Sequence, residues 1–450
     1  MENKDKMPKG IPYIIGNELA ERFSYYGMRA ILTEFMTIYL LDQAGNPAPM
    51  KDEESHVWFH LFGMANYLFP IIGALLADIF WGKYKTIIIL SLVYCCGHLA
   101  LSMDETRLGL SLGLTMIAIG SGGIKPCVSA HVGDQFNSGN KHLLDKVFNL
   151  FYLAINIGAA ISMLLTPYLL SHYGSRVAFA LPGLLMMLAT VIFWFGRDKF
   201  KSVEPVGLKA YWGELKKKET LQGLKNLVVV YLFMIIFWSL YEQTGSSWVT
   251  QAKSIYLNKM LDLNILGLNY EFLRFTVIPS QIQSLNSVLV IIYVPLFAFW
   301  LYPFLNRFFD FSSIRKITVG FFLTALSFFV IAWIETQVEK QIQVSILWQA
   351  LAYVILTAGE VLVYGTGLAF SYKQAPNSMK SLIMGLYMLT ISMGNLLTAA
   401  VNQFIQNDDG SSKLAGASYY WFFVWIMLIT SVLFIFVVKK YKEQTYVQED

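Results

Sequence analysis

Apolar runs of about 20 residues recur along the whole chain, and each is long enough to cross a bilayer as a helix. The 450 residues are 56% hydrophobic and only 14% charged, which fits no soluble globular class. No alternating pattern of the kind typical of a β-barrel occurs, so the runs predict helices. The predicted spans are residues 11–41, 56–81, 84–103, 108–131, 145–171, 176–196, 226–252, 280–306, 313–335, 343–373, 379–406 and 417–438. We therefore expect an all-α membrane protein with about twelve transmembrane helices.

A charged seam interrupts the first of these runs. At about 100° per residue, one helix face carries four of its polar side chains, with a fifth beside them: Glu18, Arg22, Tyr25 and Arg29, flanked by Glu21. An ionised group near the bilayer centre costs about 3 kcal/mol or more, so such groups face a protein interior or a wet cavity. A structural ion-pair lock is the alternative, but two acids beside two cations exceed what a lock needs. The seam indicates a path for a substrate or for protons.

The distribution of basic residues predicts orientation and division. Most of the 34 lysines and arginines lie in the segments that are cytoplasmic if the N-terminus is inside, so both termini are predicted to be cytoplasmic. The longest of these segments contains three consecutive lysines, Lys216 to Lys218. We predict an N-terminal six-helix bundle over residues 1–196, a basic linker over 197–225 and a C-terminal six-helix bundle over 226–450.

Two further charged residues lie deep in apolar spans. Lys125 stands in a run of glycines that ends in Pro126, and Glu360 stands beside Gly359. Each charged side chain needs a partner or a wet cavity. Pro126 also frees backbone groups beside Lys125, and these must be satisfied as well. The alternatives are that Lys125 reaches the membrane surface along its aliphatic stem and that Glu360 is an acid with local hydrogen bonds.

Several motifs together resemble one transporter family. They are, in order, Glu18-x-x-Glu21-Arg22, Gly120-x-Gly122-Gly123-Ile124-Lys125-Pro126, Phe151-Tyr152-Leu153-x-Ile155-Asn156, Phe237-Trp238 with Glu242-Gln243, and Gly359-Glu360. This series is similar to that of the proton-dependent oligopeptide transporter (POT) family of the major facilitator superfamily. The resemblance implies two six-helix bundles that rock about a site at the membrane midplane.

The resemblance also implies roles for individual residues. Substrate contacts are expected from Arg22, Tyr25, Tyr26, Tyr67, Lys125, Asn156, Trp238, Asn286 and Glu360. Proton coupling is expected from Glu18, Glu21, Arg22, Lys125 and His60, and a gate from Arg29 with Glu242. Physical chemistry alone leaves other readings open: the two asparagines can bridge helices, the aromatic residues can be plain core, and a lone helix histidine can be structural.

These observations predict a proton-coupled symporter that imports di- and tripeptides by alternating access. The cations of the N-terminal half and Glu360 of the C-terminal half match the two charged ends of a peptide. We expect a monomer in the cell membrane, driven by the proton gradient, with no cofactor, metal or nucleic acid. A transporter of another small anion such as nitrate and a non-transporting nutrient receptor remain alternatives. No metal-ligand cluster or catalytic arrangement occurs in the helices, so we do not expect an enzyme.

Overall fold

The computed structural model describes residues 7–136, 140, 144–201, 204–205, 218–262, 274–373, 380–406 and 412–440. The middle of the predicted linker, including Lys216 and Lys217, lies outside this part of the chain. The longer helices are α1 (Ile11–Glu34), α2 (Asp52–Leu75), α3 (Lys83–Met103), α4 (Arg107–Asp134), α5 (Leu144–Phe195), α7 (Lys218–Tyr241), α9 (Ser284–Leu296), α11 (Ser313–Glu339), α12 (Leu347–Glu360), α14 (Lys380–Ile405) and α15 (Ala417–Lys440).

Shorter elements extend or connect these helices. Wider π-helical turns continue α1, α2, α9 and α12: η1 (Phe35–Tyr39), η2 (Leu76–Trp81), η8 (Phe297–Leu301) and η9 (Val361–Gly365). The remaining short helices are η4 (Arg197–Lys199), η5 (Glu242–Gly245), α8 (Ser247–Ala252), η7 (Pro279–Gln283), α10 (Tyr302–Leu305) and α13 (Thr366–Lys373). Four short strands form two pairs: β1 (Leu257–Asn258) is parallel to β4 (Val344–Ser345), and β2 (Met260–Asp262) is antiparallel to β3 (Arg274–Thr276).

Ten described helical segments are long and apolar enough to cross a membrane. One of them, residues 153–195, has 43 residues and contains Gly174 at φ 81°, a non-helical angle that separates two spans. The charged α1 is not among the ten, and including it brings the number of spans to twelve. The chain is therefore a multi-pass membrane protein.

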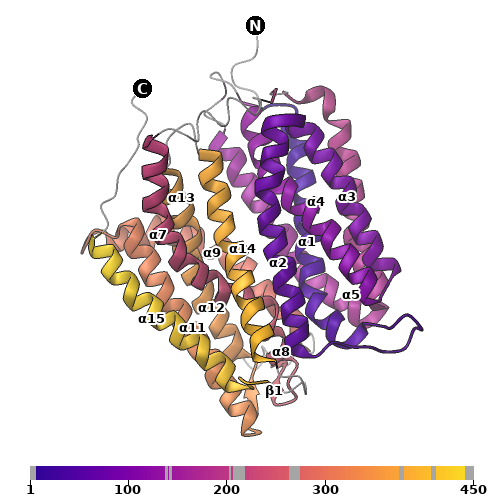
Figure 1. Ribbon diagram of the computed structural model, residues 1–450, viewed down its shortest axis with the longest axis vertical. Helices are drawn as coiled ribbons and strands as arrows, with labels where there is room; N and C mark the ends of the chain where they lie inside the picture. Colours follow the sequence, from indigo (N-terminus) through magenta and orange to yellow (C-terminus); the bar gives the residue numbers. More distant parts are fainter. Residues whose placement is uncertain are drawn as a thin grey trace.

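The start of α1 and the end of α15 lie toward the same end of the molecule, with α8 and β1 at the opposite end, called the far end below (Figure 1). Helices α1 to α5 form one body and α7 to α15 the other, side by side (Figure 1). Each body has its own cluster of buried apolar side chains, one drawn from residues 11–193 and the other mainly from residues 227–434. Helix α2 packs on α14 and α5 packs on α9, and these contacts join the bodies.

Glycines permit the closest helix contacts within each body. A Cβ at Gly73 of α2 would lie 2.3 Å from the carbonyl oxygen of Gly123 in α4. A Cβ at Gly359 of α12 would lie 2.9 Å from the carbonyl oxygen of Gly320 in α11. Both contacts bring two backbones together as small residues do in other membrane bundles, and they fix the depth of Lys125 and Glu360, each within two residues of such a glycine.

Candidate functional site

The charged seam on α1 forms a buried ion-pair cluster. Arg22 Nε lies 2.6 Å from Glu18 Oε1 and 3.2 Å from Glu21 Oε2. The pair of Glu18 and Arg22 follows from their spacing of four residues on one helix. Ser121 of α4 donates a hydrogen bond of 2.8 Å to Glu21 Oε1. Both acids are almost fully buried, so Arg22 is held by two carboxylates inside the N-terminal body.

Lys125 of α4 lies on aromatic faces. Its Nζ is 4.0 Å from the ring centroid of Tyr25 and 4.8 Å from that of Tyr67. The side chain is 6% exposed, and Nζ has no hydrogen-bond partner among the described residues. The Tyr25 hydroxyl in turn accepts a hydrogen bond of 2.9 Å from Asn66 Nδ2. The side chain therefore lies within the bundle, where cation–π contacts stabilise it.

Glu360 lies on the opposite body, at the C-terminal end of α12. Asn286 of α9 donates from Nδ2 to Glu360 Oε2 at 2.7 Å and to Thr357 Oγ1 at 3.0 Å. The Tyr241 hydroxyl donates to Asn286 Oδ1 at 3.3 Å. Glu360 makes no ion pair within the described residues, and its carboxyl group is held by the Asn286 amide.

Aromatic side chains lie near the charged residues of each body. Tyr26 packs edge-on against Tyr25, with ring centroids 5.2 Å apart. Trp238 of α7 packs edge-on against Tyr364 at 5.8 Å. Asn156 is buried on α5, the helix that packs along α1.

The bodies meet at the far end through polar contacts. Arg29 of α1 donates to Glu242 of η5, and Thr33 Oγ1 donates to the carbonyl of Gly245 at 2.8 Å. His60 of α2 contacts Asn395 Oδ1 of α14 at 2.9 Å through Nδ1 and Ser246 Oγ at 2.8 Å through Nε2. The histidine is fully buried, and both of its ring nitrogens are occupied by groups of the other body.

Several contact residues were not predicted from the sequence. They are Asn66, Ser121, Tyr241 and, at the far end, His56, Thr250, Ser246, Asn395 and Gln283. His56 lies one helical turn before His60, so the spacing of the two histidines was a usable signal. The others are Tyr241 and uncharged polar residues of a kind common in membrane helices, and only packing identifies them.

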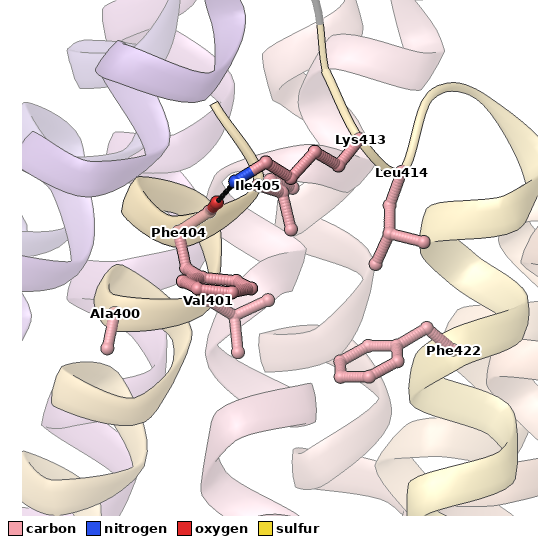
Figure 2. Close-up of a pocket in the computed structure, with 7 residues that line it drawn as sticks. All are labelled: Ala400, Val401, Phe404, Ile405, Lys413, Leu414 and Phe422. Carbon is pink, nitrogen blue, oxygen red and sulfur yellow. Dashed lines mark hydrogen bonds between the residues drawn. The ribbon is translucent and has the colours of Figure 1, made fainter. Parts of the chain in front are cut away.

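A separate hollow between α14 and α15 does not resemble a peptide site. It has a volume of about 520 Å³ and is lined mainly by apolar side chains, among them Val401, Phe404 and Phe422. Figure 2 shows its one charged residue, Lys413, with Nζ donating to the carbonyl of Phe404. Its lining offers no carboxylate, whereas the region between Arg22 and Glu360 carries both signs of charge. Among the described residues, no group of three or more acids, histidines or cysteines could hold a metal ion.

Comparisons with known proteins agree with this architecture. The model of the POT family matches residues 84–211 and 206–422. Peptide transporter family 1 of Drosophila melanogaster is 35% identical over 379 residues, which cover 74% of this chain and 48% of the relative. Solute carrier family 15 member 2 of Rattus norvegicus is 36% identical over 385 residues, which cover 74% of this chain and 50% of the relative. The chain thus spans about half the length of these relatives.

Two solved structures match the chain almost end to end. The POT family transporter PepTSo is 31% identical with a TM-score of 0.86, over 98% of this chain and 99% of that one. An auto-inhibited POT family peptide transporter is 30% identical with a TM-score of 0.85, over 98% and 99% of the two chains. These matches confirm the predicted fold of two six-helix bundles.

Proposed function

Because this chain belongs to the POT family, a family of transporters and not of enzymes, we propose that it is a proton-coupled symporter that imports di- and tripeptides. Relatives in the family carry the name of peptide transporters. The observation that carries the proposal is the placement of unlike charges on the two bodies. Lys125 and Arg22 belong to one body and Glu360 to the other.

A peptide zwitterion has the same polarity as this arrangement. Its carboxylate would bind Lys125 and Arg22, and its amine would bind Glu360. Asn286 would then orient the Glu360 carboxylate, while Tyr25, Tyr26, Tyr67, Asn156 and Trp238 would line the space around the peptide. Charge-assisted hydrogen bonds at both ends are stronger than neutral ones, which supports recognition of the peptide backbone irrespective of side chains.

Proton coupling would act through the cluster on α1. With Glu18 and Glu21 ionised, Arg22 is held by acids of its own helix. Protonation of one acid would release Arg22, and the released guanidinium would bind the peptide carboxylate together with Lys125. Proton and peptide binding would thus favour each other by linkage. His60 would be a further proton site, linked to closure by its contacts with Asn395 and Ser246.

Alternating access would follow from the far-end contacts. If the termini are cytoplasmic, as the basic residues predict, the far end is the outer mouth, and Arg29 with Glu242 is its gate. Opening would separate the bundles of residues 1–196 and 226–450 around the basic linker 197–225. We place the protein in the cell membrane as a monomer that needs no cofactor beyond the proton gradient.

Two other functions make different demands on the same site. A transporter of nitrate or a similar anion would use the cations and leave Glu360 and Asn286 without a ligand. A nutrient receptor would bind peptide without moving it. The carboxyl group of Glu360 has only the Asn286 amide and no cation as a partner among the described residues, which supports a ligand that carries an amine.

Uptake by purified protein in liposomes tests the proposal. With an inward proton gradient, labelled dialanine should accumulate above its external concentration, and a protonophore should abolish the accumulation. Nitrate in excess should not compete. Binding without uptake would support the receptor, and competition by nitrate with no dialanine uptake would support the anion transporter.

A further inference from the structure

A second layer of contacts joins the two bodies beyond the Arg29–Glu242 pair. Lys253, which directly follows α8, donates from Nζ to Thr37 Oγ1 in η1. Thr37 lies eight residues after Arg29, which is about two helical turns or 12 Å further toward the far end. The lysine side chain is only partly exposed, so this layer is not a loose surface contact.

Acidic residues of the N-terminal body act on this lysine. Glu34 precedes Thr37 by three residues and therefore lies on the same helix face. The Thr37 hydroxyl that accepts from Lys253 lies 3.4 Å from the Glu34 carbonyl oxygen. Burial lowers the pKa of Lys253 below its ordinary value, while the carboxylates of Asp52 and Glu34 raise it. The ammonium does not form a direct ion pair with either acid within the described residues. It is held by Thr37 in an acidic environment.

Glu34 also joins the two bodies directly. Its Oε2 accepts a hydrogen bond of 2.7 Å from Ser280 Oγ in η7 of the C-terminal body. The Glu34 side chain is 7% exposed. A buried carboxylate is costly without partners. Here Ser280 of the other body donates to Glu34, and the positive charge of Lys253 also stabilises the carboxylate. Separation of the bodies at this point would remove both.

We propose that Lys253 and Glu34 form a second gating layer that holds the far-end mouth closed, outside the Arg29–Glu242 gate. The two layers have opposite polarity. In the inner layer the N-terminal body supplies the cation, and in the outer layer it supplies the acids. If one body slid along the helix axes by one layer, Arg29 would face Lys253 or Glu34 would face Glu242. Such pairs of like charge are unfavourable, so the reversed order also fixes the relative position of the closed bodies. This inference rests on the proposed alternating-access function.

The experiment measures opening of the mouth directly. Nitroxide labels at Gln43→Cys and Gln343→Cys mark exposed positions on the two bodies at the far end. They are introduced after Cys95, Cys96 and Cys127 are replaced by alanine, and their separation is measured by pulsed electron resonance in lipid nanodiscs. Lys253→Met should raise the population of long distances by about fivefold or more, an ordinary size for a coupling of this kind. Glu34→Gln should shift the distribution in the same direction.

Lys259 provides the matched control. It is a lysine near the same end, but its Nζ donates to carbonyls of Ala252 and Ser254 within its own body. Lys259→Met should leave the distances unchanged, and Lys253→Arg should restore the native distribution. Unchanged distances in both Lys253→Met and Glu34→Gln would overturn the proposal. If the variants shifted to long distances but the native protein did not transport dialanine, the gate would be supported and the proposed substrate contradicted.

Discussion

The Nζ of Lys125 lies 4.0 Å from the ring centroid of Tyr25, and no described group accepts a hydrogen bond from it. A buried ammonium held only by π faces leaves all of its hydrogen-bonding capacity unused. Glu18 and Glu21 are engaged by Arg22. Lys125 thus makes no ion pair within the described residues, and under the proposed function it would bind the peptide carboxylate.

The first prediction concerns Lys125. Lys125→Ala should reduce dialanine uptake by about 10- to 100-fold, because a hydrogen bond to a charged group contributes about 1.5–3 kcal/mol. Initial rates of labelled dialanine uptake into liposomes measure the effect. Lys199→Ala serves as the control, since that lysine lies in η4 on the surface and contacts Tyr13. Full activity of Lys125→Ala would contradict the assignment.

A second prediction concerns the amine of the peptide. Native protein should take up dialanine far better than N-acetyl dialanine, whose amine is blocked. Glu360→Ala should lose most dialanine uptake and should no longer distinguish the two substrates, because the carboxylate that Asn286 orients is absent. Competition curves for both peptides against a labelled tracer provide the measurement. If acetylation weakened the native protein and the variant by the same factor, Glu360 would not bind the amine.

The third prediction tests the ion pair between the bodies. Arg29 and Glu242 are almost fully buried, and either residue alone would be left as an unpaired charge. Arg29→Glu and Glu242→Arg should therefore each abolish uptake. The double exchange, which restores the pair with reversed polarity, should recover part of it. The controls are the amount of each of the three variants in the membrane and its monodispersity after purification. Complete inactivity of a well-folded double variant would contradict the pairing of Arg29 with Glu242.

The fourth prediction is about stability. Gly73→Val places a branched side chain where a Cβ already lies 2.3 Å from a backbone oxygen of Gly123, and it should cost about 2 kcal/mol or more. Thermal unfolding followed by tryptophan fluorescence should show a clear decrease in Tm. At Gly16 of α1 the space that a Cβ would occupy is open, with no neighbouring side chain within 4 Å, so Gly16→Ala should leave Tm unchanged. Equal Tm values for both variants would argue against the close contact of α2 and α4.

Local features of the site were predictable from the sequence, whereas contacts between distant residues were not. The pair of Glu18 and Arg22 follows from helical spacing alone. The pair of Arg29 and Glu242 joins residues 213 positions apart, and only the family resemblance indicated it. The contact of His60 with Asn395 spans 335 positions and had no such precedent in the sequence, because its partner depends on how α2 packs on α14.

Helix boundaries, too, were predicted only in part. The apolar runs predicted twelve spans, and this was confirmed by the fold. The predicted spans 145–171 and 176–196 leave a loop of four residues. In the structure the chain turns at Gly174 alone, because the positive φ of this glycine makes a longer loop unnecessary. The span 226–252 was predicted as one helix, yet it tightens into η5 at Glu242. Residues 242–247 are polar, in the order Glu-Gln-Thr-Gly-Ser-Ser. Hydropathy averaged over the whole span hides this stretch and does not indicate a change of winding.

The last prediction concerns proton coupling. Glu21 receives a hydrogen bond from Ser121 and lies 3.2 Å from Arg22, so a neutral side chain at this position weakens the hold on the guanidinium without changing the shape of the site. Glu21→Gln mimics the protonated acid permanently. The variant should still exchange labelled for unlabelled dialanine across the membrane, at least in part, because Arg22 and Lys125 remain free to bind the peptide. It should lose uphill accumulation driven by a proton gradient, because the acid can no longer release its proton inside.

Two comparisons make this result specific to coupling. Glu18→Gln should have a similar or milder effect, since Glu18 holds the same guanidinium at 2.6 Å. Glu54→Gln is the matched control, because Glu54 pairs with Arg107 within the N-terminal body and is part of neither cluster. Exchange and accumulation are measured on the same liposomes, so a folding defect would reduce both and a coupling defect only the second. If Glu21→Gln accumulated dialanine as well as the native protein, coupling would have to reside elsewhere, and His60 and Glu242 would be the next residues to substitute.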